Sequence, residues 1–456
     1  MRGFRACEKV PPNKENIGES GMKFRHLAAA AVLILASASG AMAKDNWLGA
    51  WGFVPLPLPP GTTPAPAPSS VAPLAANAGQ APAVNPPGPL LLDNPGNVPV
   101  VTPEGDPTNI TIRQLVRVSA AGNRIRLRFS NEGGVDVLVA GAVHVGIAGP
   151  DGSVIAGTDR TVTFDGHGGV AVPASAPLVS DPVELKVEAL QKLVISSYSP
   201  GAIVRGGHSL FQYVSGTPGD QTGAAQLPNQ KIMRLTALVT QVEVDAATAN
   251  AVVVTLGDSI TEGALSTSNA FHGWPDRLAE RLVAARSKYA VVNAGIGGNR
   301  LLRYGTGQNA LARFDRDVLG VPGVKAVILL EGINDIGRGF TPAGPQDPVT
   351  LEALIAADKQ VITRAHAHGI KVIGSLLTPY GGAGYASPAG EAVRSGLNKW
   401  IATSGAFDGV VDFATATADK TNPLTFRADF NLKDKLHPND AGYQAMADAI
   451  DLSLLK

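Results

Sequence analysis

The order of hydrophobic and polar residues along the chain divides it into regions with different periods. Between about 108 and 245, short stretches alternate with period two, and residues 124–129 do so strictly, as a half-buried strand does. Glycine-rich turns separate these stretches, so the pattern predicts many short antiparallel strands. We therefore expect residues 108–245 to form a β-sandwich with an accessory role, either structural or carbohydrate-binding.

From about residue 250 the pattern changes to apolar runs that alternate with helical periods. The runs are rich in β-branched residues, as in strands buried on both faces of a sheet. They lie at 251–256, 290–294, 325–331, 370–377 and 409–413, and the helical segments lie at 274–286, 309–319, 351–368, 391–403 and 441–454. This alternation predicts that residues 246–456 form a doubly wound α/β domain with a parallel sheet. Ligands bind at the carboxyl ends of the strands in such domains, which directs attention to the loops that follow them.

A targeting pattern precedes these regions. Lys23 and Arg25 are followed by an apolar run at 27–35 and by the small-residue motif Ala41-Met42-Ala43. This layout predicts a signal peptide over Met22–Ala43 and an exported protein, periplasmic or secreted. The run is short for a transmembrane span, and the other reading is an N-terminal buried helix. Because a signal peptide begins near the initiator methionine, residues 1–21 indicate that Met22 is the true start.

A proline-rich segment lies between the targeting pattern and the β-region. Residues 55–107 contain 16 of the 34 prolines, which predicts an extended linker over most of 60–100. Trp47, Trp51 and Phe53 precede the linker and are expected to dock on a folded domain, since exposed tryptophans are costly. The predicted organisation is a leader and signal peptide (1–43), a Trp-containing segment and linker (44–107), the β-sandwich (108–245) and the α/β domain (246–456).

The composition excludes several classes of protein. The 456 residues include 38 Lys and Arg against 38 Asp and Glu, and this balance argues against a nucleic-acid partner. Cys7 is the single cysteine and is lost with the signal peptide, so a cysteine nucleophile is excluded. His366 and His368 are two residues apart on a predicted helix and cannot share a face, so no metal is implied, and no organic cofactor either.

Three strand-end loops carry candidate chemistry. Ser259 follows the first α/β strand in Gly257-Asp258-Ser259, on a turn that can expose its hydroxyl. Gly298 lies after the second strand, where glycine allows a backbone N–H to approach a ligand closely. The alternative for this loop is a dinucleotide-binding turn, but position 300 is Arg300 where the motif needs glycine. Asn334 follows the third strand and either aims its amide into the crevice or closes an Asx-turn.

A histidine near the C-terminus completes the set. Among eight histidines, only His437 has a carboxylate three residues earlier in a predicted loop, at Asp434. That spacing lets Asp434 accept a hydrogen bond from Nδ1–H and leaves Nε2 to take a proton from a serine.

Together the four segments resemble the GDSL, or SGNH, family of serine hydrolases. The matching segments are Gly257-Asp258-Ser259, Asn293-Ala294-Gly295-Ile296-Gly297-Gly298-Asn299, Gly332-Ile333-Asn334-Asp335 and Asp434-x-x-His437-Pro438. The resemblance implies a flavodoxin-like three-layer α/β/α fold. It also implies Ser259 as nucleophile, His437 as general base and Asp434 as the group that orients it. The oxyanion hole would be formed by Ser259, Gly298 and Asn334. The order of Trp-Leu-Gly-Ala-Trp, β-domain and hydrolase domain resembles a secreted, xylan-esterase-like bacterial subgroup.

These observations predict a serine carboxylic-ester hydrolase for short acyl or acetyl esters, including those of polysaccharides. The alternatives are a lysophospholipase or thioesterase of the same family, and a surface glycan-binding protein with an inactive hydrolase domain. The substrate is expected to be a small-molecule or glycan ester, with no stable membrane anchor after signal cleavage. Trp274, Tyr304 and Tyr380 are expected either to pack against a sugar ring or to be packing residues beside the crevice.

Overall fold

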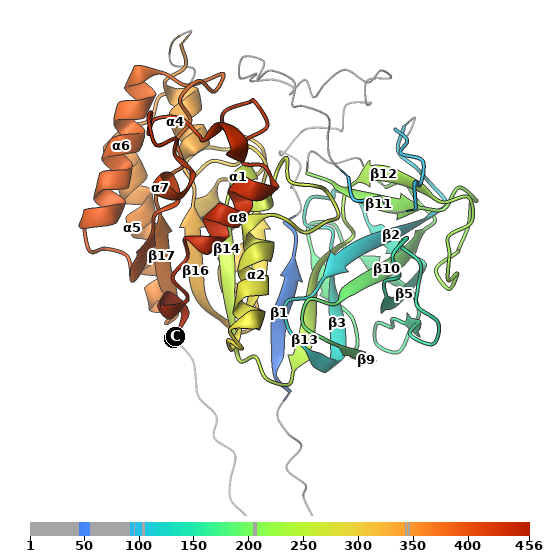
Figure 1. Cartoon of the computed structure of the whole chain (residues 1–456). Coiled ribbons are helices and arrows are strands. Elements are labelled where there is room, and N and C mark those ends of the chain that lie inside the picture. The colour runs from blue at the N-terminus through green and yellow to red at the C-terminus, as the bar shows by residue number, and fades with distance from the viewer. Residues whose placement is uncertain are drawn as a thin grey trace, which may run out of the picture. The chain divides into compact units, whose positions relative to one another are not determined.

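Antiparallel strands build the described part of the chain up to residue 246, and those after residue 108 agree with the period-two pattern (Figure 1). They are β1 Trp47–Gly52, β2 Ile110–Arg117, β3 Gly122–Ser130, β4 Leu138–Ala140, β5 Ala142–Ile147, β6 Arg160–Thr161, β7 Val170–Val172, β8 Pro177–Val179, β9 Val183–Val187, β10 Lys192–Ser199, β11 Leu210–Val214, β12 Lys231–Leu235 and β13 Val239–Ala246. Strands β4 and β7 pair as a small two-stranded sheet. Of the two larger sheets, one has the order β1-β13-β3-β8, with β9 also paired to β3, and the other has the order β12-β11-β2-β10-β5-β6. Apolar side chains of both sheets belong to one buried cluster.

The computed structural model describes residues 45–54, 92–94, 96–102, 105–203, 208–342, 344 and 347–456. The predicted signal peptide and most of the predicted linker lie outside these residues. The Trp-containing segment docks as expected, because β1 pairs with β13 and buries Leu48 and Ala50. The Trp47 ring lies under the guanidinium groups of Arg124 and Arg126, at 5.5 and 4.5 Å from its centroid. No helix within the described ranges is long and apolar enough to cross a membrane.

A parallel sheet with flanking helices forms the C-terminal part of the chain. Its strands are β14 Ala251–Gly257, β15 Tyr289–Gly295, β16 Val324–Leu330, β17 Lys371–Ser375 and β18 Gly409–Val411, in the order β15-β14-β16-β17-β18. This is the flavodoxin-like order, in which the first strand lies between the second and the third. Gly257 pairs with Gly295 on one side and Leu330 on the other. Three strand ends therefore meet at one place, and the loops that follow them start side by side.

Two groups of helices cover the parallel sheet. The helices are α1 Ser259–Glu262, α2 Trp274–Ala284, α3 Ala310–Phe314, α4 Ile333–Gly339, α5 Leu351–Ala367, α6 Pro388–Thr403, α7 Phe413–Thr417 and α8 Asp440–Asp448. One π-helical turn (Asp315–Leu319) continues α3, and 3₁₀ turns lie at Ala428–Phe430 and Leu452–Leu455. Helices α2, α7 and α8 contact one another, and α3 to α6 form a second contacting group (Figure 1). The three-layer α/β/α architecture expected from the sequence is confirmed.

One buried carboxyl interrupts the apolar face of α5 and gives a stability prediction. Asp358 is 3% exposed, and burial raises its pKa to about 8. Between the ordinary pKa of 3.8 and about 8, the folded protein keeps this proton while the unfolded chain loses it. The free energy of unfolding should therefore fall as pH rises through this window, by about 1.4 kcal/mol per pH unit from this group, and level off above it. We expect Asp358→Asn to remove this pH dependence. At pH 9 the variant should be several kcal/mol more stable to unfolding than the unsubstituted protein.

Urea unfolding of both proteins at several pH values measures this effect. Glu352→Gln, an exposed substitution on the same helix, is the control and should change stability little at any pH. Equal stability of Asp358→Asn and the unsubstituted protein at pH 9 would contradict the prediction.

Candidate active site

Ser259 lies at the first turn after β14. Asp258 caps α1 by accepting a hydrogen bond from the Ile260 N–H at 2.8 Å, so the serine starts a helix directly at the strand end. Gly257 is required before it, because a Cβ there would lie 2.3 Å from the Leu330 carbonyl oxygen of the neighbouring strand. These constraints fix the Ser259 backbone at the centre of the sheet edge.

Two hydrogen bonds connect Ser259, His437 and Asp434. The Ser259 hydroxyl lies 2.7 Å from His437 Nε2, and His437 Nδ1 lies 2.5 Å from Asp434 Oδ2. The other oxygen of Asp434 accepts from the backbone N–H groups of Leu436 and His437, both at 2.9 Å. Burial alone would raise the pKa of Asp434, but the hydrogen bond and charge of His437 bring it below its ordinary value. A serine and a histidine that are 178 positions apart thus lie in one hydrogen-bonded chain with an aspartate, an arrangement that suits a nucleophile and its base.

The backbone around Asp434 is strained. Lys433 and Lys435, on either side of it, have φ angles of 81° and 59°, which non-glycine residues rarely adopt. Asp434 itself is buried, and Asn431 supports the loop by accepting from the Lys433 N–H at 2.9 Å. Strain of this kind persists only where surrounding contacts over-determine the backbone. Here those contacts direct a carboxylate inward toward His437.

Gly298 and Asn334 lie on the two strand-end loops beside Ser259. Gly298 has a φ of 72°, and a Cβ at this position would lie 2.7 Å from the Thr306 hydroxyl, so only glycine fits without strain. The Asn334 amide nitrogen donates to the Asn299 carbonyl at 2.9 Å, which links its loop to the residue after Gly298. An amide nitrogen carries two N–H groups, so one remains for a ligand.

The side-chain oxygen of Asn334 also has a partner. It accepts a hydrogen bond from the Tyr385 hydroxyl at 3.3 Å, which fixes the orientation of the amide. The Asn334 nitrogen is therefore the atom that can donate to developing negative charge.

The structure corrects the sugar-contact expectation for two of three aromatic residues. Trp274 is fully buried and packs against Phe413 at 5.2 Å between ring centroids. Tyr380 is 1% exposed and packs against Tyr385 at 6.0 Å. Both are core residues, which was the alternative interpretation, because the first turn of α2 and the loop after β17 direct these two aromatic rings inward. Tyr304 is 44% exposed and is the one of the three that a ligand could reach.

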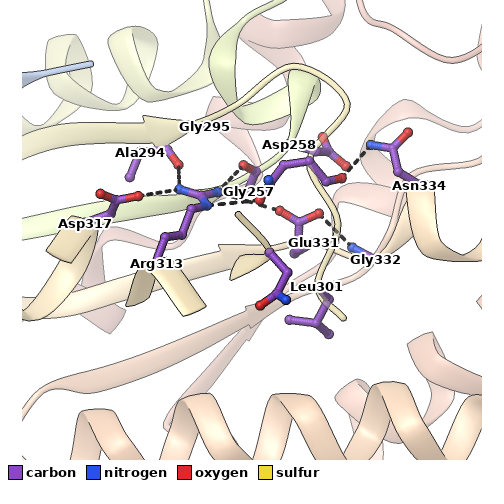
Figure 2. A network of polar contacts seen from close by, with 12 residues as sticks. Gly257, Asp258, Ala294, Gly295, Leu301, Arg313, Asp317, Glu331, Gly332 and Asn334 are labelled. Atoms are coloured by element: carbon purple, nitrogen blue, oxygen red, sulfur yellow. Dashed lines mark hydrogen bonds and ion pairs between the residues drawn. The ribbon is translucent and has the colours of Figure 1, made fainter. Parts of the chain in front are cut away.

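Other residues of the site were not assigned a role from the sequence. The Asp335 carboxylate accepts from the backbone N–H groups of Leu301 and Leu302, at 2.6 and 3.1 Å, and so anchors the chain that follows Gly298. Arg313 is fully buried and lies beneath the strand ends (Figure 2). Its signal in the sequence is a charge in the apolar stripe of the predicted helix 309–319, with Asp317 one turn later.

The β-rich part also reaches the site. His208 Nε2 lies 2.9 Å from a carboxylate oxygen of Glu262, on the helix that begins with Ser259. His208 Nδ1 is 2.7 Å from the Val54 carbonyl, and its ring stacks on Phe53 at 4.3 Å. Burial would raise the pKa of Glu262, but the charge and hydrogen bond of His208 lower it below its ordinary value. Such a contact between distant segments has no signal in the local sequence.

Candidate metal ligands do not cluster among the described residues. The part of the chain that the structure describes contains no group of three or more His, Cys, Asp or Glu side chains that could hold an ion.

Comparison with known proteins places the α/β part in a family. Residues 255–445 match the GDSL-like lipase/acylhydrolase family. No curated protein matches the chain.

Solved structures resemble the chain over less than half its length. A candidate lipolytic protein of the G-D-S-L family from Desulfitobacterium hafniense is 26% identical, with 44% of this chain and 97% of that chain covered and a TM-score of 0.34. A GDSL-like lipase from Bacteroides thetaiotaomicron is 21% identical (45% and 88% covered, TM-score 0.35). A catalytic mutant of an acetylxylan esterase from Geobacillus stearothermophilus is 19% identical (45% and 94% covered, TM-score 0.36). On the family match, the chain carries a GDSL-like lipase/acylhydrolase domain over residues 255–445, the domain of a carboxylic ester hydrolase.

Proposed function

We propose that the chain is an exported serine esterase that hydrolyses short acyl esters, with acetyl esters of polysaccharides as the natural class of substrate. The observation that carries this proposal is the hydrogen-bonded chain of Ser259, His437 and Asp434 at the edge of the parallel sheet. The family match supports ester hydrolysis as the reaction.

Acylation follows from the positions of the three side chains. The Ser259 oxygen attacks the ester carbonyl carbon while His437 Nε2 takes the hydroxyl proton. Asp434 stabilises the imidazolium that forms, because its carboxylate faces Nδ1. The tetrahedral intermediate then expels the alcohol, which receives the proton from His437, and an acyl-serine remains.

Deacylation repeats these steps with water. His437 removes a proton from water, which attacks the acyl carbon, and the proton then returns to Ser259 as the acid leaves. In both steps the oxyanion would accept hydrogen bonds from the N–H groups of Ser259 and Gly298 and from the Asn334 amide. Loss of one such donor typically lowers kcat by about 10²–10³-fold.

The preference for short acyl chains rests on the loops that follow α4 and β17. Val349, Tyr380 and Tyr385 belong to these loops, and their side chains are buried in the core. The loops thus direct these apolar groups into the core and leave them off the surface, which favours a small acyl group over a long chain. Export rests on the signal-peptide pattern at Met22–Ala43, and N-terminal sequencing of the exported protein, expected to start at Lys44, tests it.

A series of p-nitrophenyl esters from acetate to laurate tests the activity and the acyl preference together. We expect kcat/KM to be highest for acetate and butyrate and to fall at least about tenfold by laurate. The protein should also release acetate from acetylated xylan, and NMR measures this release. A maximum at laurate would instead indicate a long-chain acyl hydrolase. No hydrolysis of any ester, with no labelling by a fluorophosphonate probe, would reject the esterase.

A further inference from the structure

A single buried guanidinium contacts the ends of three strands of the parallel sheet. Arg313 donates from Nη2 to the Gly257 carbonyl at 2.9 Å, from Nη1 to the Ala294 carbonyl at 2.7 Å and from Nε to the side-chain oxygen of Asn299 at 3.0 Å. Its Nη2 also lies 3.9 Å from a carboxylate oxygen of Glu331 (Figure 2). These partners belong to the ends of β14, β15 and β16 or to the loops directly after them.

Each partner is close in sequence to one of the proposed oxyanion donors. Gly257 is two residues before Ser259, Asn299 directly follows Gly298, and Glu331 is three residues before Asn334. Asn334 also donates to the Asn299 backbone carbonyl, so the second and third loops are coupled through the residue that Arg313 holds.

The charge of Arg313 is balanced on its outer side. Nη1 lies 3.1 Å from Asp317, one helical turn away, and Arg316 binds the same carboxylate with both Nε and Nη2, at 2.5 and 2.9 Å. Burial raises the pKa of Glu331 well above its ordinary value, which favours its neutral form and leaves Asp317 as the counter-ion. The fork of the guanidinium is thereby held in one orientation, with its remaining donors directed at the strand ends.

We infer that Arg313 is a positioning residue that sets the relative placement of the Ser259, Gly298 and Asn334 donors. It touches no substrate. It fixes the backbone of the three segments that carry the donors. Stabilisation of an oxyanion requires donors that are already in position before the negative charge develops. The inference rests on the proposed function, because it concerns the donors of that reaction.

Lysine keeps the charge but cannot reproduce the planar fork, so Arg313→Lys tests geometry. We measure kcat for p-nitrophenyl acetate per active site, with the sites counted by fluorophosphonate titration. We expect kcat to fall by at least about tenfold, but by no more than the roughly 10²–10³-fold that follows loss of a whole donor, and KM to stay nearly unchanged. The affinity for an aryl trifluoromethyl ketone, which adds to the serine and forms an oxyanion, should fall by a similar factor. The affinity for an ether analogue of the substrate, which has no carbonyl and cannot form an oxyanion, should not change.

Arg113→Met is the matched control. Arg113 is also fully buried and donates to the carbonyls of Gly152, Ala224 and Ala225, but it lies between strands of the β-rich part. The Arg113→Met substitution should lower the stability of the protein. It should leave kcat per titrated site and the affinity for the ketone at their original values. Asp317→Asn, which neutralises the counter-ion that Arg313 shares with Arg316, provides a milder second variant and should weaken ketone binding in the same direction.

Unchanged kcat per site and ketone affinity in Arg313→Lys would overturn the inference. If that variant does not fold, unchanged ketone affinity in Asp317→Asn would overturn it instead. Failure of the proposed function is a separate result, because the unsubstituted protein would then neither hydrolyse the esters nor bind the ketone.

Discussion

Replacement of Ser259 by alanine should lower kcat for p-nitrophenyl acetate on the order of 10⁶-fold, the loss that follows removal of the nucleophile in a triad. The physical reason is that His437, whose Nε2 lies 2.7 Å from the Ser259 oxygen, then has no hydroxyl to deprotonate. The acyl-enzyme cannot form, so the pre-steady-state burst of p-nitrophenol should disappear. Stopped-flow absorbance measures the burst, and initial rates measure kcat.

Ser266→Ala is the control for this substitution. Ser266 lies in the loop after α1 and donates to the Gly263 carbonyl at 2.6 Å, with no contact to His437 among its hydrogen bonds. Its removal should leave the burst and kcat in place. A Ser259→Ala protein that kept more than about a tenth of the rate would exclude Ser259 as the nucleophile.

Contacts among the candidate site residues could be predicted from the sequence where local order determines them. β14 is a fully buried strand that ends at Gly257, directly before Asp258 and Ser259. A strand that ends at the centre of a parallel sheet places the next residues at the sheet edge. Asp434 and His437 are three residues apart in one loop, so their hydrogen bond could be expected from spacing alone. Here the chain itself brings the groups together.

Contacts made by tertiary packing could not be predicted in this way. His208 meets Glu262 from the β-rich part, and Arg313 reaches strand ends up to 56 residues away. An arginine within a helical segment usually lies in solvent. The position of Arg313 in the apolar stripe of the predicted helix indicates that it is buried, but does not indicate which groups it contacts. Trp274 was a candidate for ligand contact and is instead buried. An aromatic residue beside a loop can face a ligand or the core, and only tertiary packing decides between them.

Replacement of Asp434 by asparagine is expected to give the second-largest loss, about 10²- to 10⁴-fold in kcat. An asparagine oxygen can still accept from the backbone N–H groups of Leu436 and His437, so the loop should keep its shape. The new NH₂ group would then face His437 Nδ1 and favour the tautomer that carries its proton on Nε2. That tautomer cannot accept the Ser259 proton. Steady-state rates with p-nitrophenyl acetate measure the loss, and circular dichroism verifies the fold.

The pH dependence of this variant distinguishes an orienting carboxylate from a structural one. Because the pKa of Asp434 is lowered, its stabilising contribution is complete above about pH 4 and is lost only as pH falls through the lower folded-state value. Asp434→Asn should therefore lack this acid-side loss of stability and still show the low kcat at neutral pH. Asp429→Asn, an exposed change in the preceding 3₁₀ turn, should leave kcat unaltered. If the two variants had equal kcat, Asp434 would support the loop without orienting His437.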